Sequence, residues 1–341
     1  MITLILPKRL TLDNAIDFCN KLWDVEDSDT YEFDFQFIRF TEPFTMLYVA
    51  NELKRFSFLK KESKSKCQAS NYKHLSYQSH MGFFKAFGLN HGNEPGKATG
   101  SSTYLPLTIL DIEEIKQEAS DKYLHIGDLL ELKAENMAQL LTQQGDGDLV
   151  DTLTFSIREI MRNVVEHSNS KIIEYCAQYW PSKDQVELAI MDTGDGIMKG
   201  LSSNPFLHIE SERDALHLAL MPGVSGKMYK GVKKRKNDPW QNSGFGLYMT
   251  SRICRNGGDF LIISNNSGLL LNDEKIDKKC TYKGTALRLR MDTSKITTYS
   301  SMLEKYRNEG SDISKEFGSQ SMVEPSIAST MLARDFNQKI E

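Results

Sequence analysis

The sequence predicts an α/β protein with two folded blocks, and three observations carry this prediction. The chain has 341 residues, about twice the usual length of one domain. Apolar runs of period two, which are typical of strands, alternate with stretches of helical periodicity. Motifs that suggest chemistry occur only within residues 149–292. We therefore expect an N-terminal block at residues 1–110, a helical bridge at 111–148, a second block at 149–292 and a flexible C-terminal tail at 293–341.

The composition excludes several classes of protein. An apolar fraction of 40% rules out a chain that is disordered throughout, and a net charge of −4 gives no general attraction to nucleic acid or to an anionic membrane. No apolar run approaches the roughly 20 residues of a membrane helix. The five cysteines are scattered without a C-x-x-C pair. We expect a cytoplasmic protein that binds neither a membrane nor nucleic acid and has no zinc site or disulfide framework.

The first block is expected to run strand, helix, strand, helix, because its apolar spacing switches between the two periods. A helical turn and a last strand then close it. The expected elements are strands at residues 2–6, 33–37 and 104–110, helices at residues 12–22 and 46–56, and the turn at residues 81–88.

The bridge and the tail differ in composition. Residues 111–148 are acidic and have apolar side chains at helical spacing, until Gly145 and Gly147 break the pattern. The tail holds 13 Ser or Thr in 49 positions and only isolated apolar residues. We expect the tail to contain at most one short helix, near residues 326–336.

The first candidate motif is a polar row on an amphipathic helix at residues 148–167. At 100° per residue, Glu159, Asn163 and His167 align along the edge of the apolar face, while Arg158 and Arg162 fall near the solvent side. An amide oxygen can bind Mg²⁺, and a carboxylate can take a proton from water or a hydroxyl. On its own, such a row is also typical of an ordinary helix edge.

A strand and a glycine-rich turn make the second motif. Val186, Leu188 and Ile190 alternate, and the strand ends at Asp192, which is followed by Gly194 and Gly196. Glycines let the backbone approach a flat ligand, and the Asp192 carboxylate can accept a hydrogen bond from an amine. The same pattern is common in simple turns.

The third and fourth motifs lie further along the chain. The segment Ser243-Gly244-Phe245-Gly246-Leu247 directly precedes a helical stretch, and glycines at a helix N-terminus expose N–H groups that suit phosphate. Thr285 opens a strand in which alternate positions are apolar, and its hydroxyl can contact a purine. Either motif alone also fits a helix cap or a plain strand.

In combination and in this order, the four motifs resemble the GHKL ATP-binding domain, a Bergerat-type two-layer α/β sandwich found in gyrase, heat-shock chaperones, histidine kinases and mismatch-repair proteins. The resemblance covers residues 149–292, and the row on the helix is most similar to that of anti-sigma-factor serine kinases. It implies ATP and Mg²⁺ as cofactors. By this resemblance Glu159 is the general base, Asn163 the Mg²⁺ ligand, Asp192 and Thr285 the adenine contacts, Gly194 and Gly196 the nucleotide floor, and Ser243, Gly244, Phe245, Gly246 and Leu247 the phosphate contacts.

A basic stretch between the second and third motifs corresponds to the mobile ATP lid of similar proteins. Six basic residues lie within residues 227–236 without an acid among them. Lys227 is therefore a candidate contact for triphosphate charge, and a solvated basic loop is the alternative.

The first block resembles a STAS domain, the fold of anti-anti-sigma factors. In that family the second helix begins with an acidic residue and a phosphorylatable serine, whereas this chain has Pro43 after Glu42. A phosphorylation switch in this block would have to use Thr41 or Thr45.

Two functions from different classes stay open. One is an enzyme, a Mg²⁺-dependent ATPase or a protein serine/threonine kinase in signalling or regulation. The other is a non-catalytic switch, in which ATP controls the binding of a protein partner. A sensor histidine kinase fits less well, because His125 lacks the acidic neighbour of a phosphoacceptor. A homodimer is compatible with the resemblance, since related ATP-binding domains often pair.

Overall fold

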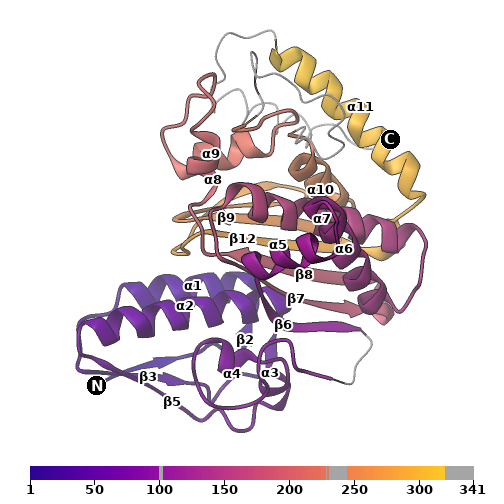
Figure 1. Ribbon diagram of the computed structural model, residues 1–341. Coiled ribbons are helices and arrows are strands. Elements are labelled where there is room, and N and C mark those ends of the chain that lie inside the picture. Colours follow the sequence, from indigo (N-terminus) through magenta and orange to yellow (C-terminus); the bar gives the residue numbers. More distant parts are fainter. Residues whose placement is uncertain (100–102, 228, 230–243, 319–341) are drawn as a thin grey trace.

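Two sheets organise this α/β chain, which we describe from a computed structural model that covers residues 1–99, 103–227, 229 and 244–318. A three-stranded parallel sheet belongs to the N-terminal block, and a seven-stranded antiparallel sheet to the rest (Figure 1). Helices cover both faces of the larger sheet. No helix of the described residues is long and apolar enough to cross a membrane.

The N-terminal block confirms the expected order of strands and helices. Its parallel strands are β1 (Ile2–Ile5), β3 (Thr30–Asp34) and β5 (Lys66–Ser70), and α1 (Leu12–Trp23) and α2 (Pro43–Glu62) connect them. α2 begins before the expected residue 46, because a proline at the first helical turn lacks only an N–H that would have no partner, and it continues past residue 56 to Glu62. The remaining elements are β2 (Arg9–Leu10), β4 (Phe40–Thr41), α3 (Ser76–His80) and α4 (Phe83–Ala86).

The larger sheet has the strand order β11-β10-β9-β12-β8-β7-β6. It draws on residues from 104 to 292, and every neighbouring pair is antiparallel. Its strands are β6 (Tyr104–Asp111), β7 (Ile172–Trp180), β8 (Gln185–Asp192), β9 (Asp259–Ser264), β10 (Ser267–Leu271), β11 (Lys275–Lys279) and β12 (Thr285–Asp292).

The first boundary therefore differs from the expected one. Residues 104–110 were assigned to the N-terminal block, but β6 pairs with β7 and forms an edge of the larger sheet. The bridge is helical as expected, with α5 (Ile112–Asp121) and α6 (Ile126–Thr142). It is no separate connector, because α6 packs against α7 (Asp148–His167) in the same hydrophobic core.

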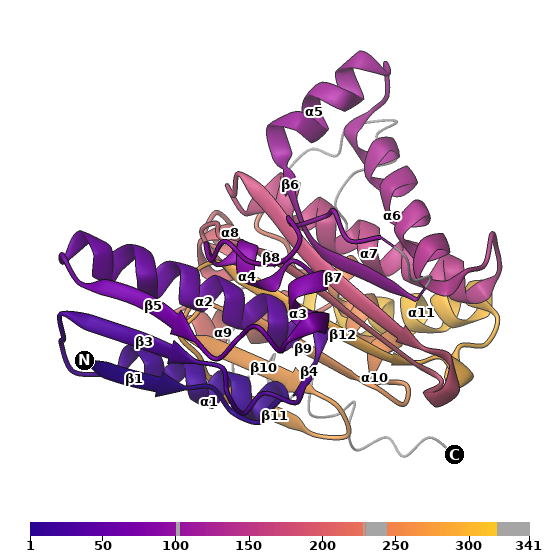
Figure 2. The ribbon, with the colours of Figure 1, turned by 90° about the horizontal axis from the view of Figure 1, so that it is seen from below.

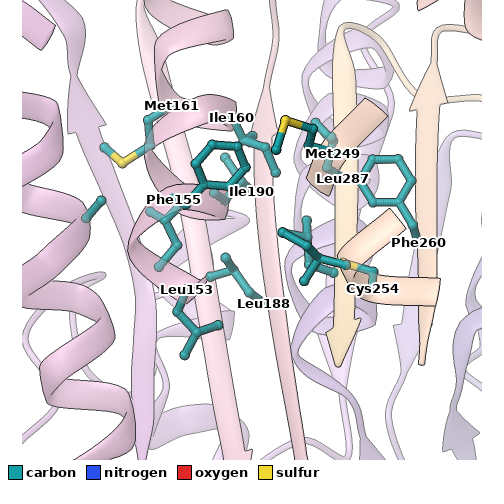
Figure 3. Close-up of a cluster of buried hydrophobic side chains, with 14 of the residues drawn as sticks. Leu153, Phe155, Ile160, Met161, Leu188, Ile190, Met249, Cys254, Phe260 and Leu287 are labelled. Carbon is teal, nitrogen blue, oxygen red and sulfur yellow. The ribbon is translucent and has the colours of Figure 1, made fainter. Parts of the chain in front are cut away.

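One face of the larger sheet carries α7 and α10 (Gly246–Arg255) (Figure 3). Apolar side chains of these helices meet apolar side chains of β8, β9 and β12, and their burial drives the packing. The labelled residues are Leu153, Phe155, Ile160 and Met161 of α7, Met249 and Cys254 of α10, Leu188 and Ile190 of β8, Phe260 of β9 and Leu287 of β12. The short helices α8 (Ile197–Leu201) and α9 (Glu212–Ala219) follow β8.

The other face of the same sheet is covered by α1 and α2, which lie between the two sheets (Figures 1 and 2). Phe44 and Tyr48 of α2 share a buried cluster with Ala189 and Met191 of β8. The expected two-layer sandwich is thus incomplete as a description. The structure has a third layer, because α1 and α2 cover the other face of the sheet. β8 is accordingly buried on both faces from Val186 to Asp192.

A buried charge network joins α2 to this sheet. Arg288 of β12 is 3% exposed, and its guanidinium donates to Glu187 Oε2 (3.1 Å) and Asp259 Oδ1 (2.9 Å). Its Nη2 also lies 3.6 Å from Glu42 Oε2, at the start of α2. Glu187 Oε1 accepts a hydrogen bond from the backbone N–H of Phe44 (3.0 Å), in the first turn of α2. One cation therefore neutralises carboxylates of both blocks.

The tail begins with structure that its composition does not predict. After a 3₁₀ turn at Thr293–Lys295, α11 (Tyr299–Gly318) buries Met302, Leu303 and Tyr306 in the core shared with α7 and α10. Gly310 allows close approach, since a Cβ there would lie 3.0 Å from the ring of Phe245. The expectation that the chain is flexible from residue 293 onward is therefore wrong for residues 299–318, which form this helix. The helix expected near residues 326–336 lies outside the described residues.

Candidate functional site

A cavity lies between α7, α8 and the start of α10, above strands β8, β9 and β12. It holds about 860 Å³, including the space at its open mouth. The lining combines apolar walls with a few polar groups, which is typical of small-molecule sites. The lining residues are Glu159, Ile160, Asn163, Val164, His167, Ser168, Asp192, Gly196, Ile197, Gly200, Leu201, Ala219, Val224, Ser225, Gly226, Gly244, Gly246, Leu247, Ile262, Thr285 and Leu287.

The polar row of α7 faces this cavity. Glu159, Asn163 and His167 all line it, so the helical spacing brings the three to one side as the sequence predicts. Burial, with the nearby charges of Lys227 and Arg162, lowers the pKa of His167 to about 4. His167 is therefore neutral at pH 7.

The two arginines of α7 do not lie on the solvent side as expected. Arg162 is 8% exposed, and its Nε donates to Glu166 Oε1 (2.7 Å). Arg158 donates from Nη2 to Glu159 Oε1 (2.9 Å) and from Nη1 to Glu131 Oε1 of α6 (3.2 Å). The helical wheel gives only the direction of the Cα–Cβ bond, whereas a long arginine side chain folds back toward carboxylates on neighbouring faces.

At the floor of the cavity, Asp192 and Thr285 stand opposite each other on β8 and β12. Asp192 is 1% exposed, and its Oδ1 accepts a hydrogen bond from Gly194 N (2.7 Å). Burial raises the pKa of the Asp192 carboxyl to about 7, although hydrogen bonds from Gly194 and Thr285 favour its charged form. The carboxyl is therefore poised to change charge near neutrality.

Two glycines hold the turn after β8 in place. Gly194 lies against Ser168 O, where a Cβ would clash, and it is outside the cavity lining. Gly196 lines the cavity at φ 81°, and a Cβ there would lie 2.5 Å from Asn265 Nδ2. Only glycine fits either position, so both serve the backbone course of the turn.

The glycine-rich segment before α10 forms the mouth of the cavity. Gly244, Gly246 and Leu247 line it, and Gly246 is the first residue of α10. Phe245 does not line it, since its ring points toward Gly310 of α11. Ser243 lies outside the described residues.

Lys227 approaches the cavity from its edge without lining it. Its ammonium donates to the backbone carbonyl of Glu166, beside His167. The rest of the expected basic stretch, residues 228–236, lies outside the described residues except for Tyr229.

Sequence reasoning missed a polar network behind the floor. Glu212 of α9 accepts hydrogen bonds from Ser264 Oγ (2.6 Å) and Asn265 Nδ2 (2.6 Å), and Ser264 Oγ accepts from Ile197 N (2.8 Å). This network fixes the turn between β9 and β10 against the Gly196 turn. The polar pair Ser264-Asn265 directly after a buried apolar strand is the signal that could have found it.

The structure also shows the surroundings of the three residues considered for phosphorylation, Thr41, Thr45 and His125. Thr41 and Thr45 are 6% and 0% exposed, and Thr45 Oγ1 donates to Leu10 O (2.6 Å), so neither hydroxyl faces solvent in this structure. His125 caps α6, where its Nδ1 accepts a hydrogen bond from Gly127 N (3.1 Å).

Replacing Gly246 with alanine should destabilise the fold. A Cβ at this position would overlap Glu159 Oε2, so either the carboxylate or the first turn of α10 has to move. Gly145→Ala is the control, because a Cβ at Gly145 meets nothing within 4 Å. Gly257→Ala is a poorer control, because an added Cβ there would be crowded. Urea unfolding of the two variants tests the change. Equal behaviour of the Gly246 and Gly145 variants would contradict the close packing.

The raised pKa of Asp192 predicts a pH dependence of stability. The folded state holds this proton up to about pH 7, whereas the unfolded chain releases it near pH 4. Between these values the folded state binds more protons, so the contribution of Asp192 to stability falls as the pH rises, by at most about 1.4 kcal/mol per unit.

The comparison with Asp192→Asn isolates this effect, because His167 has the opposite slope in both proteins. Its lowered pKa makes the folded state more stable as the pH rises from about 4 toward 6.5. The stability of the asparagine variant relative to the native chain should rise from pH 5 to pH 7, as measured by urea unfolding. A constant difference across this range would show that Asp192 has no raised pKa.

Scans of the chain against protein-family models, curated proteins and solved structures gave no match. The chemistry of the cavity therefore has to be inferred from its own lining residues. Nine of the residues singled out in the sequence motifs line this one cavity, namely Glu159, Asn163, His167, Asp192, Gly196, Gly244, Gly246, Leu247 and Thr285.

Proposed function

We propose that the chain binds Mg-ATP in this cavity and acts as an ATPase or a protein serine/threonine kinase in regulation. The observation that carries the proposal is the convergence of four motifs, far apart in the sequence, on one cavity. This convergence also supports the GHKL-like assignment of the second block. The STAS-like assignment of the first block, also part of the proposal, is supported by its order of strands and helices.

The cavity suits an adenine nucleotide in three respects. Ile262 and Leu287 offer apolar surface to a planar base, next to a carboxyl at Asp192 that accepts a hydrogen bond from an amine when it is charged. Gly244 and Gly246 add no side chains of their own at the N-terminus of α10, beside the Glu159 carboxylate, and the backbone N–H groups and helix dipole there favour phosphate. The amide oxygen of Asn163 is a hard ligand of the kind that Mg²⁺ prefers.

In this proposal Glu159 accepts a proton from the attacking water or hydroxyl group. Asn163 would hold the metal, whose charge would offset that of the phosphates. The neutral His167 adds no positive charge at the edge of the site. Apolar residues of α7 and of the sheet form the buried walls of the cavity.

The non-catalytic switch is the second candidate function, and the pairing of Arg158 favours it. This arginine occupies Glu159 Oε1 and also binds Glu131 of α6. A proton-transfer role for Glu159 has to use its other oxygen or displace the guanidinium. In the switch, ATP would bind without turnover and change how the STAS-like block or the tail meets a protein partner.

The deciding experiment incubates the whole chain with Mg²⁺ and γ-labelled ATP and follows free phosphate and protein-bound label together. Asn163→Ala is the test variant, and Asn308→Ala, at an exposed position of α11, is the matched control. Label released as phosphate identifies an ATPase, and label on protein identifies a kinase. Binding without either product supports the switch, whereas absence of nucleotide binding overturns the proposal.

A further inference from the structure

A second cleft lies in the N-terminal block, at the carboxyl ends of two neighbouring parallel strands. β3 and β5 lie side by side (Figure 2), and the loops that follow them form the walls. The cleft holds about 1040 Å³, including space open to solvent. We call it the basic cleft and define it by its lining residues, Gln36, Arg39, Ala69, Ser70, Asn71, Tyr72, Lys73 and His74.

The charge of the basic cleft is positive. Arg39 and Lys73 line it, no acidic residue does, and Arg39 Nη1 lies 3.4 Å from His74 Nε2. Lys8 and Arg9 lie close to Arg39 in the structure, because the backbone N–H of Arg39 donates to Lys8 O (2.8 Å). Within the described part of the chain, none of these four cations forms an ion pair. The whole chain has a net charge of −4, so this concentration of positive charge is local to the cleft.

The acidic side chain at the end of β3 holds the two loops together. Asp34 Oδ1 accepts hydrogen bonds from Gln36 N (2.9 Å) in one loop and from Asn71 Nδ2 (2.9 Å) in the other. Phe35 N also donates to Ser70 O (3.2 Å). Both walls of the cleft are therefore fixed to each other before any ligand arrives, which lowers the entropy cost of binding.

The guanidinium of Arg39 is anchored as well. Its Nη1 donates to the backbone carbonyls of Gln36 (3.2 Å) and Ile38 (2.9 Å). On the opposite wall, the ring of Tyr72 packs against Phe84 (5.4 Å between centroids) and His91 (5.0 Å). The cleft thus combines an immobilised arginine, a lysine without a described partner and hydroxyl and amide donors. These groups match the oxygens of a phosphate, which guanidinium groups bind with directed hydrogen bonds.

We propose that the basic cleft binds a phosphate group, through Arg39 and Lys73 and with a further hydrogen bond from His74. The group comes either from free phosphate or from a phosphorylated side chain of a polypeptide, since both present the same oxygens. The proposal does not depend on ATP binding, because the cleft belongs to the first block and shares no lining residue with the cavity between α7 and the larger sheet.

The test follows backbone amide NMR signals of residues 71–74 in the whole chain at low salt. Inorganic phosphate is one probe, and a short phosphoserine peptide, with its unphosphorylated form as reference, is the other. The double variant Arg39→Gln with Lys73→Gln removes two charges from the cleft. Lys61→Gln with Lys64→Gln is the matched control, because both lysines are exposed in the same block.

We expect saturable shifts of these signals, weakened about tenfold or more by the cleft variant and unchanged by the control variant. Tighter binding of the phosphopeptide than of phosphate identifies a phosphorylated side chain as the source, and equal binding identifies free phosphate. Equal weakening by both double variants, or no saturable shift with either probe, would overturn the proposal. Matching melting curves of the two variants exclude unfolding as the cause.

Discussion

Replacing Arg288 with methionine is expected to destabilise the fold by about 3–5 kcal/mol. The substitution keeps much of the apolar stem but removes the charge that binds Glu187, Asp259 and Glu42. Glu187 is 1% exposed, so its carboxylate would remain buried without its strongest partner. Burial already raises the pKa of Glu42 and of Asp259 above their usual values, and loss of the cation should raise both further.

Urea unfolding of Arg288→Met and of Arg290→Met measures this effect with a matched control. Arg290 lies two positions along the same strand, is 32% exposed, and contacts Gln185 Oε1 (2.9 Å) with only a distant approach to Asp259 (4.0 Å). Its loss should cost about 1 kcal/mol or less. A second change, Glu187→Gln, should recover part of the stability of the Arg288 variant. Equal losses at the two arginines would contradict the network.

Replacing Glu159 with glutamine is expected to lower ATP turnover by about 100-fold or more while nucleotide binding is retained. The amide has nearly the shape of the carboxylate but cannot accept the proton, and general-base catalysis typically contributes factors of this size. The expected result depends on the proposed function, and steady-state phosphate release together with nucleotide calorimetry measures it.

Glu166→Gln is the control for Glu159→Gln. Glu166 lies two turns further along α7, pairs with Arg162 and does not line the cavity. Its substitution should leave turnover within about threefold of the native chain. Unchanged turnover in the Glu159 variant would remove that residue from the mechanism, and lost binding would show that its role is structural.

Local patterns were sufficient for the placement of the site motifs. The 100° spacing of α7 puts Glu159, Asn163 and His167 on one side, and the structure has them lining one cavity. The strand ending at Asp192 is also visible in the sequence, because β8 alternates at Val186, Leu188 and Ile190. In both cases the relevant neighbours lie within a few positions of one another.

Long-range pairing was not predictable in the same way. β6 has the pattern of any half-buried strand, and only its pairing with β7, about 70 residues later, assigns it to the larger sheet. Ala189 and Met191 of β8 are apolar and alternate with the apolar residues on its other face. They were the available sign that helices cover both faces of this sheet. α11 was missed because Met302, Leu303 and Tyr306 are few among polar residues, although all three are buried.

The double cover of the larger sheet has a consequence for how the chain loses its structure. Ala189 and Met191 pack on Phe44 and Tyr48, so the N-terminal block supplies one side of an interior whose other side belongs to α7 and α10. Cutting the chain at a boundary drawn from the motifs would therefore leave a fragment with one apolar sheet face in water, prone to aggregate. We therefore expect the two blocks to unfold as one cooperative unit, in a single thermal transition, and neither to keep its fold when the other is removed.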